Sequence, residues 1–137
     1  MSTILVVDDQ ADIRMLFEVE LSFSDHRVLQ AADGQEALEV LEREAVDLML
    51  LDIMMPRVSG EEVLRRLGPD FDTPIVVVTG KEPHLYAEYL ELGAVDAISK
   101  PFDLGQALDV VEELLRVPST ERQEHRRRRI EQLRGRA

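Results

Sequence analysis

The chain has 137 residues, 45 % of them hydrophobic, and a formal net charge of −12 from 16 Lys and Arg against 28 Asp and Glu. This length can bury one core, and so acidic a chain is not a general nucleic-acid binder. It has no cysteine for disulfides, no basic signal-peptide start, and no apolar run near the roughly 18 residues of a membrane span. We therefore expect a cytoplasmic domain with no membrane contact.

Short apolar runs alternate with stretches of helical periodicity along the chain. Five runs rich in branched side chains predict strands at residues 3–7, 27–31, 47–51, 74–78 and 96–99. Apolar residues share helical faces after the first and last runs, at Ile13, Leu16, Phe17 and Leu21, and at Leu104, Ala107, Leu108, Val111 and Leu115. Further helix starts are predicted at residues that can cap free backbone amides, which are Asp33, Ser59 and Asp103. Another is predicted at Pro83, which suits a first helical turn.

Five strands that alternate with five helices predict an α/β fold, a doubly wound five-stranded parallel sheet with helices on both faces. The runs 3–7, 47–51 and 74–78 are the most apolar, so we expect them at the centre of the sheet. The runs 27–31 and 96–99 are less apolar, as edge strands are. The usual strand order for such a sheet is 2-1-3-4-5, with ligands at the carboxyl ends of the strands.

Polar side chains follow the predicted strands at this edge: Asp8 and Asp9, Asp52, Thr79 and Lys100. Two carboxylates about 4 Å apart repel by roughly 4 kcal/mol at an effective dielectric of 20. The cluster therefore needs a bound proton or a cation. Because no Cys or His follows these strands, an oxygen-ligated ion fits, and Mg²⁺ is the expected cofactor. A metal, an ammonium and a hydroxyl around Asp52 suit a tetrahedral anion, which predicts a carboxylate nucleophile that forms an aspartyl phosphate.

Four segments, VVDD, LLDIMMPRVSG, VVVTG and GAVDAISKPF, occur in this order at the predicted strand ends. Over about residues 3–117 they resemble the receiver domain of two-component response regulators. The resemblance implies a flavodoxin-like receiver fold for residues 1–118, phosphorylated by a histidine kinase or histidine phosphotransfer protein. It implies output through an unidentified protein on the face of the fourth helix, fifth strand and fifth helix. Such a domain catalyses only its own phosphorylation and slow dephosphorylation, so we do not expect an enzyme with a separate substrate.

The resemblance also implies roles for single residues. Asp52 would be the phosphoacceptor and a metal ligand. Asp9 would be a direct metal ligand, with Asp8 close by or acting through water. The main-chain carbonyl of Met54 would complete the protein ligands.

The remaining motif residues would act on the phosphoryl group or shape the site. Thr79 would bond a phosphoryl oxygen, Lys100 would pair with the phosphate, and the Lys100–Pro101 bond would be cis. Gly60 matches the glycine after the phosphoacceptor loop. Taken singly, most of these features also have structural explanations: Asp8 and Asp9 as a helix-start turn, Thr79 as part of a turn, and Lys100 as a solvated surface residue.

Two departures from the family pattern concern the switch and the lifetime of the phosphoryl group. Receivers commonly carry Tyr or Phe three residues before the strand-5 lysine, where this chain has Ala97, so the usual two-part switch is in doubt. Tyr86 or Tyr89 is a candidate substitute. Met54 and Lys81 flank the expected path of water, and neither can orient it as a carboxylate or amide would. We therefore expect slow self-dephosphorylation.

Residues 119–137 form a basic tail with seven arginines, and only Ile130 and Leu133 could give it an apolar stripe. We expect a frayed or solvated helix rather than an output domain. Alternatively, the run Arg126–Arg129 contacts an acidic partner, the acidic body of the domain, or nucleic acid. Nucleic acid is the weakest of these, because the tail has no aromatic residue.

Two other functions stay open. The chain could be the receiver portion of a DNA-binding transcriptional response regulator, with the tail as its linker. It could also be an aspartate-nucleophile phosphatase, although such enzymes usually need a second acid where Met54 stands and a substrate-capping insertion. The sequence does not determine the kinase, the pathway, the downstream target, or whether the chain forms a homodimer.

Overall fold

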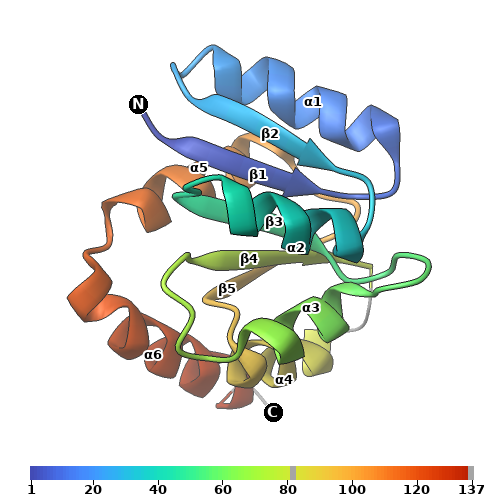
Figure 1. Cartoon of the computed structure of the whole chain (residues 1–137). Coiled ribbons are helices and arrows are strands. Elements are labelled where there is room, and N and C mark those ends of the chain that lie inside the picture. Colours follow the sequence, from blue (N-terminus) through green and yellow to red (C-terminus); the bar gives the residue numbers. More distant parts are fainter. Residues whose placement is uncertain (81–82, 136–137) are drawn as a thin grey trace.

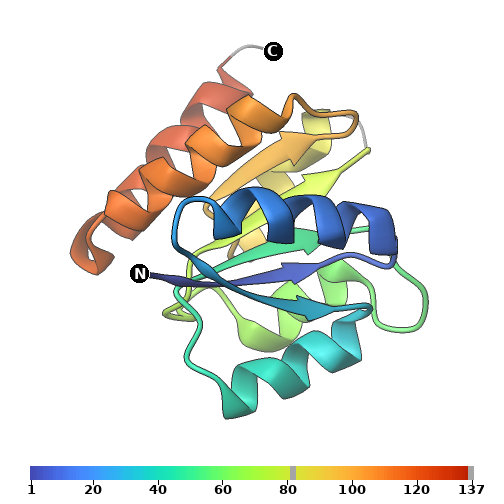
Figure 2. The same ribbon diagram turned by 90° about the horizontal axis from the view of Figure 1, so that it is seen from above.

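The computed structural model describes residues 1–80 and 83–135. Its five-stranded parallel sheet has the order β2-β1-β3-β4-β5, with helices on both faces (Figure 1, Figure 2). The predicted strand order and both edge strands are confirmed. The strands are β1 Thr3–Val7, β2 Arg27–Ala31, β3 Leu48–Asp52, β4 Ile75–Thr79 and β5 Asp96–Ser99.

The described residues form six α-helices where five were expected. The capping predictions are confirmed, because Asp33, Ser59 and Asp103 each accept a hydrogen bond from the backbone N–H three residues ahead. In the described part of the chain no helix is both long and apolar enough to cross a bilayer. The helices are α1 Ala11–Ser22, α2 Gly34–Arg43, α3 Gly60–Leu67, α4 Tyr86–Leu92, α5 Leu104–Arg116 and α6 Arg122–Arg134, with 3₁₀ turns η1 Pro83–Leu85 and η2 Ser119–Glu121.

Strand side chains alternate between two apolar layers. Leu5 and Met49 belong to the layer under α2, α3 and α4, whereas Val6 and Leu50 belong to the layer under α1 and α5. Because β3 and β4 are buried on both faces, their sequences are continuously apolar. One expected core residue was wrong: Leu16 on α1 is 38 % exposed.

The tail forms α6, which folds back against the domain instead of extending into solvent. It lies beside α4 (Figure 1), and Ile130 and Leu133 pack against the layer under α4. Arg126 is only 8 % exposed, and its guanidinium donates to main-chain carbonyls of the domain. The tail is thus helical, as expected, but it is docked rather than frayed, and the alternative contact with the body of the domain is the one present.

Candidate functional site

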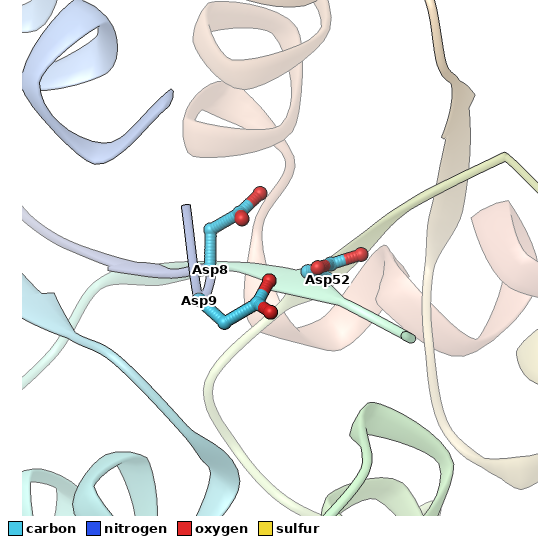
Figure 3. A group of neighbouring side chains, drawn as sticks. All are labelled: Asp8, Asp9 and Asp52. Atoms are coloured by element: carbon cyan, nitrogen blue, oxygen red, sulfur yellow. The ribbon is translucent and has the colours of Figure 1, made fainter. Parts of the chain in front are cut away.

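Three carboxylates meet at the carboxyl edge of the sheet. Asp8 and Asp9 directly follow β1, and Asp52 ends the neighbouring strand β3, in a register that pairs Val7 with Leu51. One oxygen from each carboxylate lies within 4.8 Å of the other two. Figure 3 shows the carboxyl groups of Asp8 and Asp9 on the side of β1 that faces Asp52. The predicted cluster is therefore formed.

The loop after Asp52 is held close to strand β3 by its own backbone. The N–H of Met54 donates to Asp52 Oδ1 at 3.3 Å, and the N–H of Gly60 donates to the carbonyl of Ile53 at 3.0 Å. A Cβ at Gly60 would lie 2.2 Å from the carbonyl oxygen of Asp52, so only glycine fits there. This close approach is a physical reason for the glycine that the motif contains.

Lys100 carries the positive charge of the site. Its Nζ lies 2.9 Å from Asp8 Oδ2 and 3.6 Å from Asp52 Oδ1. Its backbone N–H donates to the carbonyl of Thr79 at 2.8 Å, and the Lys100–Pro101 bond is cis, as predicted. Lys100 is thus an ion-pair partner of buried carboxylates, and the alternative of a solvated surface lysine is wrong.

Thr79 and Ala97 lie on the strands beyond Asp52. Thr79 ends β4 and is fully buried, and its Cα is paired with Ser99 of β5. Ala97 is partly buried against the layer that contains Tyr86 and Tyr89. These positions agree with a switch region next to Asp52, but the proposed roles of Thr79 and Ala97 stay predictions.

The ionisation of Asp52 is strongly perturbed in the metal-free site. Burial raises its pKa most, and the negative charge of Asp8 raises it further, whereas Lys100 and the N–H of Met54 lower it. The result is a pKa of about 6 against an ordinary value of 3.8. A divalent cation held by oxygen ligands would favour the ionised form, and the donor set of carboxylate oxygens without nitrogen or sulfur fits Mg²⁺.

Three supports of the site were missed by sequence reasoning. Arg14 on α1 donates to the carbonyl of Asp8 at 2.7 Å, and Gln10 lies 3.5 Å from the ammonium of Lys100. Arg57 in the loop after Asp52 pairs with Asp33 at 2.5 Å, which ties that loop to the start of α2. Sequence spacing held no signal for the contacts of Gln10 and Arg57, whose partners are distant in the chain, and the Arg14 contact to a main-chain carbonyl across the turn before α1 follows no helical or strand period.

The surroundings of Asp52 include an open groove on the side of α4. A cavity of about 560 Å³ is lined by Asp9, Met54, Glu88 and Tyr89, among others. The Met54 side chain is 58 % exposed there, which leaves its predicted influence on water open to test. Lys81, the second residue in that prediction, lies outside the described residues. The role of the Met54 carbonyl as a metal ligand also stays a prediction.

Comparisons with known proteins agree with this geometry. Residues 4–112 match the family model of the response regulator receiver domain. Over 100 residues the chain is 44 % identical to the probable transcriptional regulator ycf27 of Porphyridium aerugineum, which covers 72 % of this chain and 42 % of that protein. The chain thus spans less than half the length of this relative.

Two solved structures are similar in both fold and sequence. The BeF3-activated N-terminal receiver domain of Klebsiella pneumoniae RstA has a TM-score of 0.78 and 33 % identity, and the match covers 84 % of this chain and 99 % of that one. The response regulator TrrA of Thermotoga maritima, in complex with Mg²⁺ and BeF, has a TM-score of 0.74 and 32 % identity, with 83 % and 99 % covered.

Proposed function

Because the chain belongs to the family of response regulator receiver domains, we propose that it accepts a phosphoryl group on Asp52 in a Mg²⁺-dependent reaction. The donor is a phosphohistidine of a kinase or phosphotransfer protein in the cytoplasm. The observation that carries the proposal is the group of three carboxylates within 4.8 Å, with the Lys100 ammonium 3.6 Å from Asp52. If Asp8 and Asp9 only formed the turn at the start of a helix, they would not need a lysine beside them.

In the proposed transfer, a carboxylate oxygen of Asp52 forms the bond to phosphorus as the bond between phosphorus and the donor imidazole nitrogen breaks. The electron pair of the broken bond stays on that nitrogen. Mg²⁺ held by Asp8, Asp9, Asp52 and the Met54 carbonyl would neutralise the phosphoryl oxygens. Lys100 adds a second positive charge, so that positioning and charge neutralisation, rather than a general base, lower the barrier.

The signal follows from the charge that phosphorylation adds. An aspartyl phosphate brings negative charge and acceptor oxygens beside Thr79 and Lys100. A new charge-assisted hydrogen bond from Thr79 is worth about 1.5–3 kcal/mol, which is enough to shift a two-state population. With Ala97 on β5, we assign the reporting of this shift to Tyr86 and Tyr89 on α4, which are 6 % and 4 % exposed in the same apolar layer.

The phosphodonor needs a surface near Asp52, and α1 supplies one. Met15, Val19 and Phe23 lie on one helical stripe and are 63 %, 47 % and 81 % exposed. A row of exposed apolar side chains on one helix marks a protein contact. Since α1 begins directly after the Asp8-Asp9 pair, we propose that the donor docks on this stripe.

A second candidate function has one supporting observation. The ycf27 relative is named as a probable transcriptional regulator and is more than twice as long as the matched region. The chain could therefore serve as the receiver portion of a transcriptional regulator. The phosphorylation chemistry would be the same, and only the output would differ. We propose the receiver acting through protein contacts, because the described residues form one domain whose basic helix is engaged with it.

The test is phosphorylation of the full chain with acetyl phosphate and Mg²⁺, followed by intact-mass measurement. We expect the gain of one phosphoryl group in the wild type and in Glu39→Gln, a control at an exposed acid of α2, but none in Asp52→Asn. A gain that survives in Asp52→Asn would refute the assignment. Sustained hydrolysis of a small phosphomonoester would instead support the phosphatase alternative and contradict the proposal that no separate substrate is turned over.

A further inference from the structure

The surface that a downstream partner would use is partly covered by the chain itself. The expected output face consists of α4, β5 and α5. Helix α6 lies along α4 (Figure 1), and Glu113 of α5 lines a groove with Arg128 and Arg129 of α6. Docked α6 therefore blocks access to the α4 side of this face, whereas the groove between β5 and α5 that Ala97 and Val110 line stays open.

Docking depends on Arg126, whose guanidinium makes four hydrogen bonds. Arg126 donates from Nε to the carbonyl of Ala94 at 3.0 Å, and from Nη2 to that of Gly93 at 2.8 Å. Its Nη1 donates to the carbonyl of Pro69 at 3.1 Å and to Gln123 Oε1 at 2.9 Å. A planar guanidinium with fixed donor directions tolerates little displacement of its acceptors. The contact is therefore sensitive to the position of the turn between α4 and β5.

Other contacts of α6 reach the same elements. Arg129 donates to Asp96 at the start of β5 at 2.9 Å, and Arg134 pairs with Glu91 near the end of α4. Ile130 and Leu133 add apolar contact with the layer under α4. Most of these bonds are thus made to α4 or to the residues that directly follow it.

Helix α4 is also connected to the proposed phosphorylation site. Only three residues separate Thr79 from Pro83, which starts the turn leading into α4, and α4 itself has seven residues. Met54 and Tyr89 line one cavity between the phosphoacceptor loop and α4. A displacement of Thr79 toward a phosphoryl group would therefore move α4, and with it the carbonyls that Arg126 binds.

We infer that α6 is a latch: it covers the α4 side of the α4–β5–α5 face in the unphosphorylated chain, and phosphorylation of Asp52 weakens its docking and exposes that side. The inference rests on the proposed function, since it assigns a regulated element to the same site. Coupling between two sites is reciprocal. Release of α6 must therefore favour the phosphorylated form, which a merely structural helix would not do.

The experiment measures backbone hydrogen exchange by mass spectrometry on the full chain, with and without acetyl phosphate and Mg²⁺. In the wild type, we expect exchange of the α6 amides to rise about tenfold on phosphorylation, with strands β1 and β3 unchanged. In Arg126→Gln, we expect fast α6 exchange in both states and phosphorylation at a lower acetyl phosphate concentration, by a similar factor. Arg127→Gln is the control, because Arg127 is exposed and its one ion pair among the described residues is with Glu124 of its own helix.

Arg129→Gln provides a milder second variant, in case loss of Arg126 unfolds the chain. It removes only the bond to Asp96 and should shift both readouts in the same direction by a smaller factor. Phosphorylation without any change in α6 exchange, or with slower exchange, would overturn the latch and leave the proposed function standing. Absence of a phosphoryl mass gain would overturn the proposed function and the latch together.

Discussion

Replacement of Asp52 by Asn should stabilise the metal-free protein at neutral and alkaline pH. Asp52 is 3 % exposed, and its oxygen shares a small volume with those of Asp8 and Asp9. Asn keeps the size of the side chain and an oxygen that accepts from the N–H of Met54, but it has no charge to desolvate. The variant therefore removes the repulsion while preserving the packing.

The magnitude follows from the raised pKa of Asp52. A rise from 3.8 to about 6 means that the folded chain binds a proton that the unfolded chain releases. Below about pH 4 the carboxyl is protonated in both states and the pKa shift has no effect on stability. Between about pH 4 and pH 6 the free energy of unfolding falls as pH rises. Above pH 6 the ionised carboxylate destabilises the fold by up to about 3 kcal/mol. We expect Asp52→Asn to recover about 1 to 3 kcal/mol at pH 8.

Urea unfolding in EDTA at pH 4 and pH 8 tests this prediction, with Glu39→Gln as the control at an exposed acid. The advantage of Asp52→Asn should be present at pH 8 and small at pH 4. Added Mg²⁺ should stabilise the wild type by mass action and narrow the difference. Equal stability of the wild type and Asp52→Asn at pH 8 in EDTA would refute the reasoning, since it would mean that the clustered charges do not destabilise the fold.

Three further variants test the rest of the site. Lys100→Met removes the ammonium that offsets the acids, so it should lower metal-free stability at pH 8 by about 1 kcal/mol or more and slow labelling by acetyl phosphate; unchanged labelling would contradict its role. Met54→Asn places an amide where water would approach Asp52, so phosphate release should become faster, and a rate equal to that of the parent would count against this. Gly60→Ala should lower the free energy of unfolding by about 2 kcal/mol or more because of the backbone contact, whereas Gly80→Ala, with open space around its Cβ position, should change it little.

The sheet and the acidic edge could be predicted because they depend on local signals. The apolar runs of β3 and β4 have no polar interruption, and Asp52 and Thr79 end them. Side chains such as Asp33 cap helices through neighbours three residues away, which sequence spacing reveals directly. Parallel pairing then brings the strand ends together without further information.

Helix α6 could not be predicted in the same way. Its inward face carries Arg122, Arg126 and Arg129 besides Ile130 and Leu133. Arginines normally indicate a solvated helical face. The sequence pattern therefore favoured a solvated helix over one that packs against the domain. Burial of Arg126 depends on carbonyl groups left unpaired at the end of α4, and these come from distant parts of the chain. The exposed stripe on α1 was missed for a different reason. Apolar residues at helical spacing do not reveal whether the face they form packs on the core of the domain or is open to another protein.

The ion pair between Lys100 and Asp8 has a consequence for the order of binding. The lysine acts as a resident counterion, so the resting site holds a compensated pair rather than three bare acids. A divalent ion that engages Asp8 has to displace this counterion. The released ammonium, already 3.6 Å from Asp52, then becomes available to an incoming phosphoryl group. This arrangement predicts that Mg²⁺ binds before the phosphoryl donor. Initial rates of phosphorylation, measured while the concentrations of Mg²⁺ and acetyl phosphate are both varied, test this order.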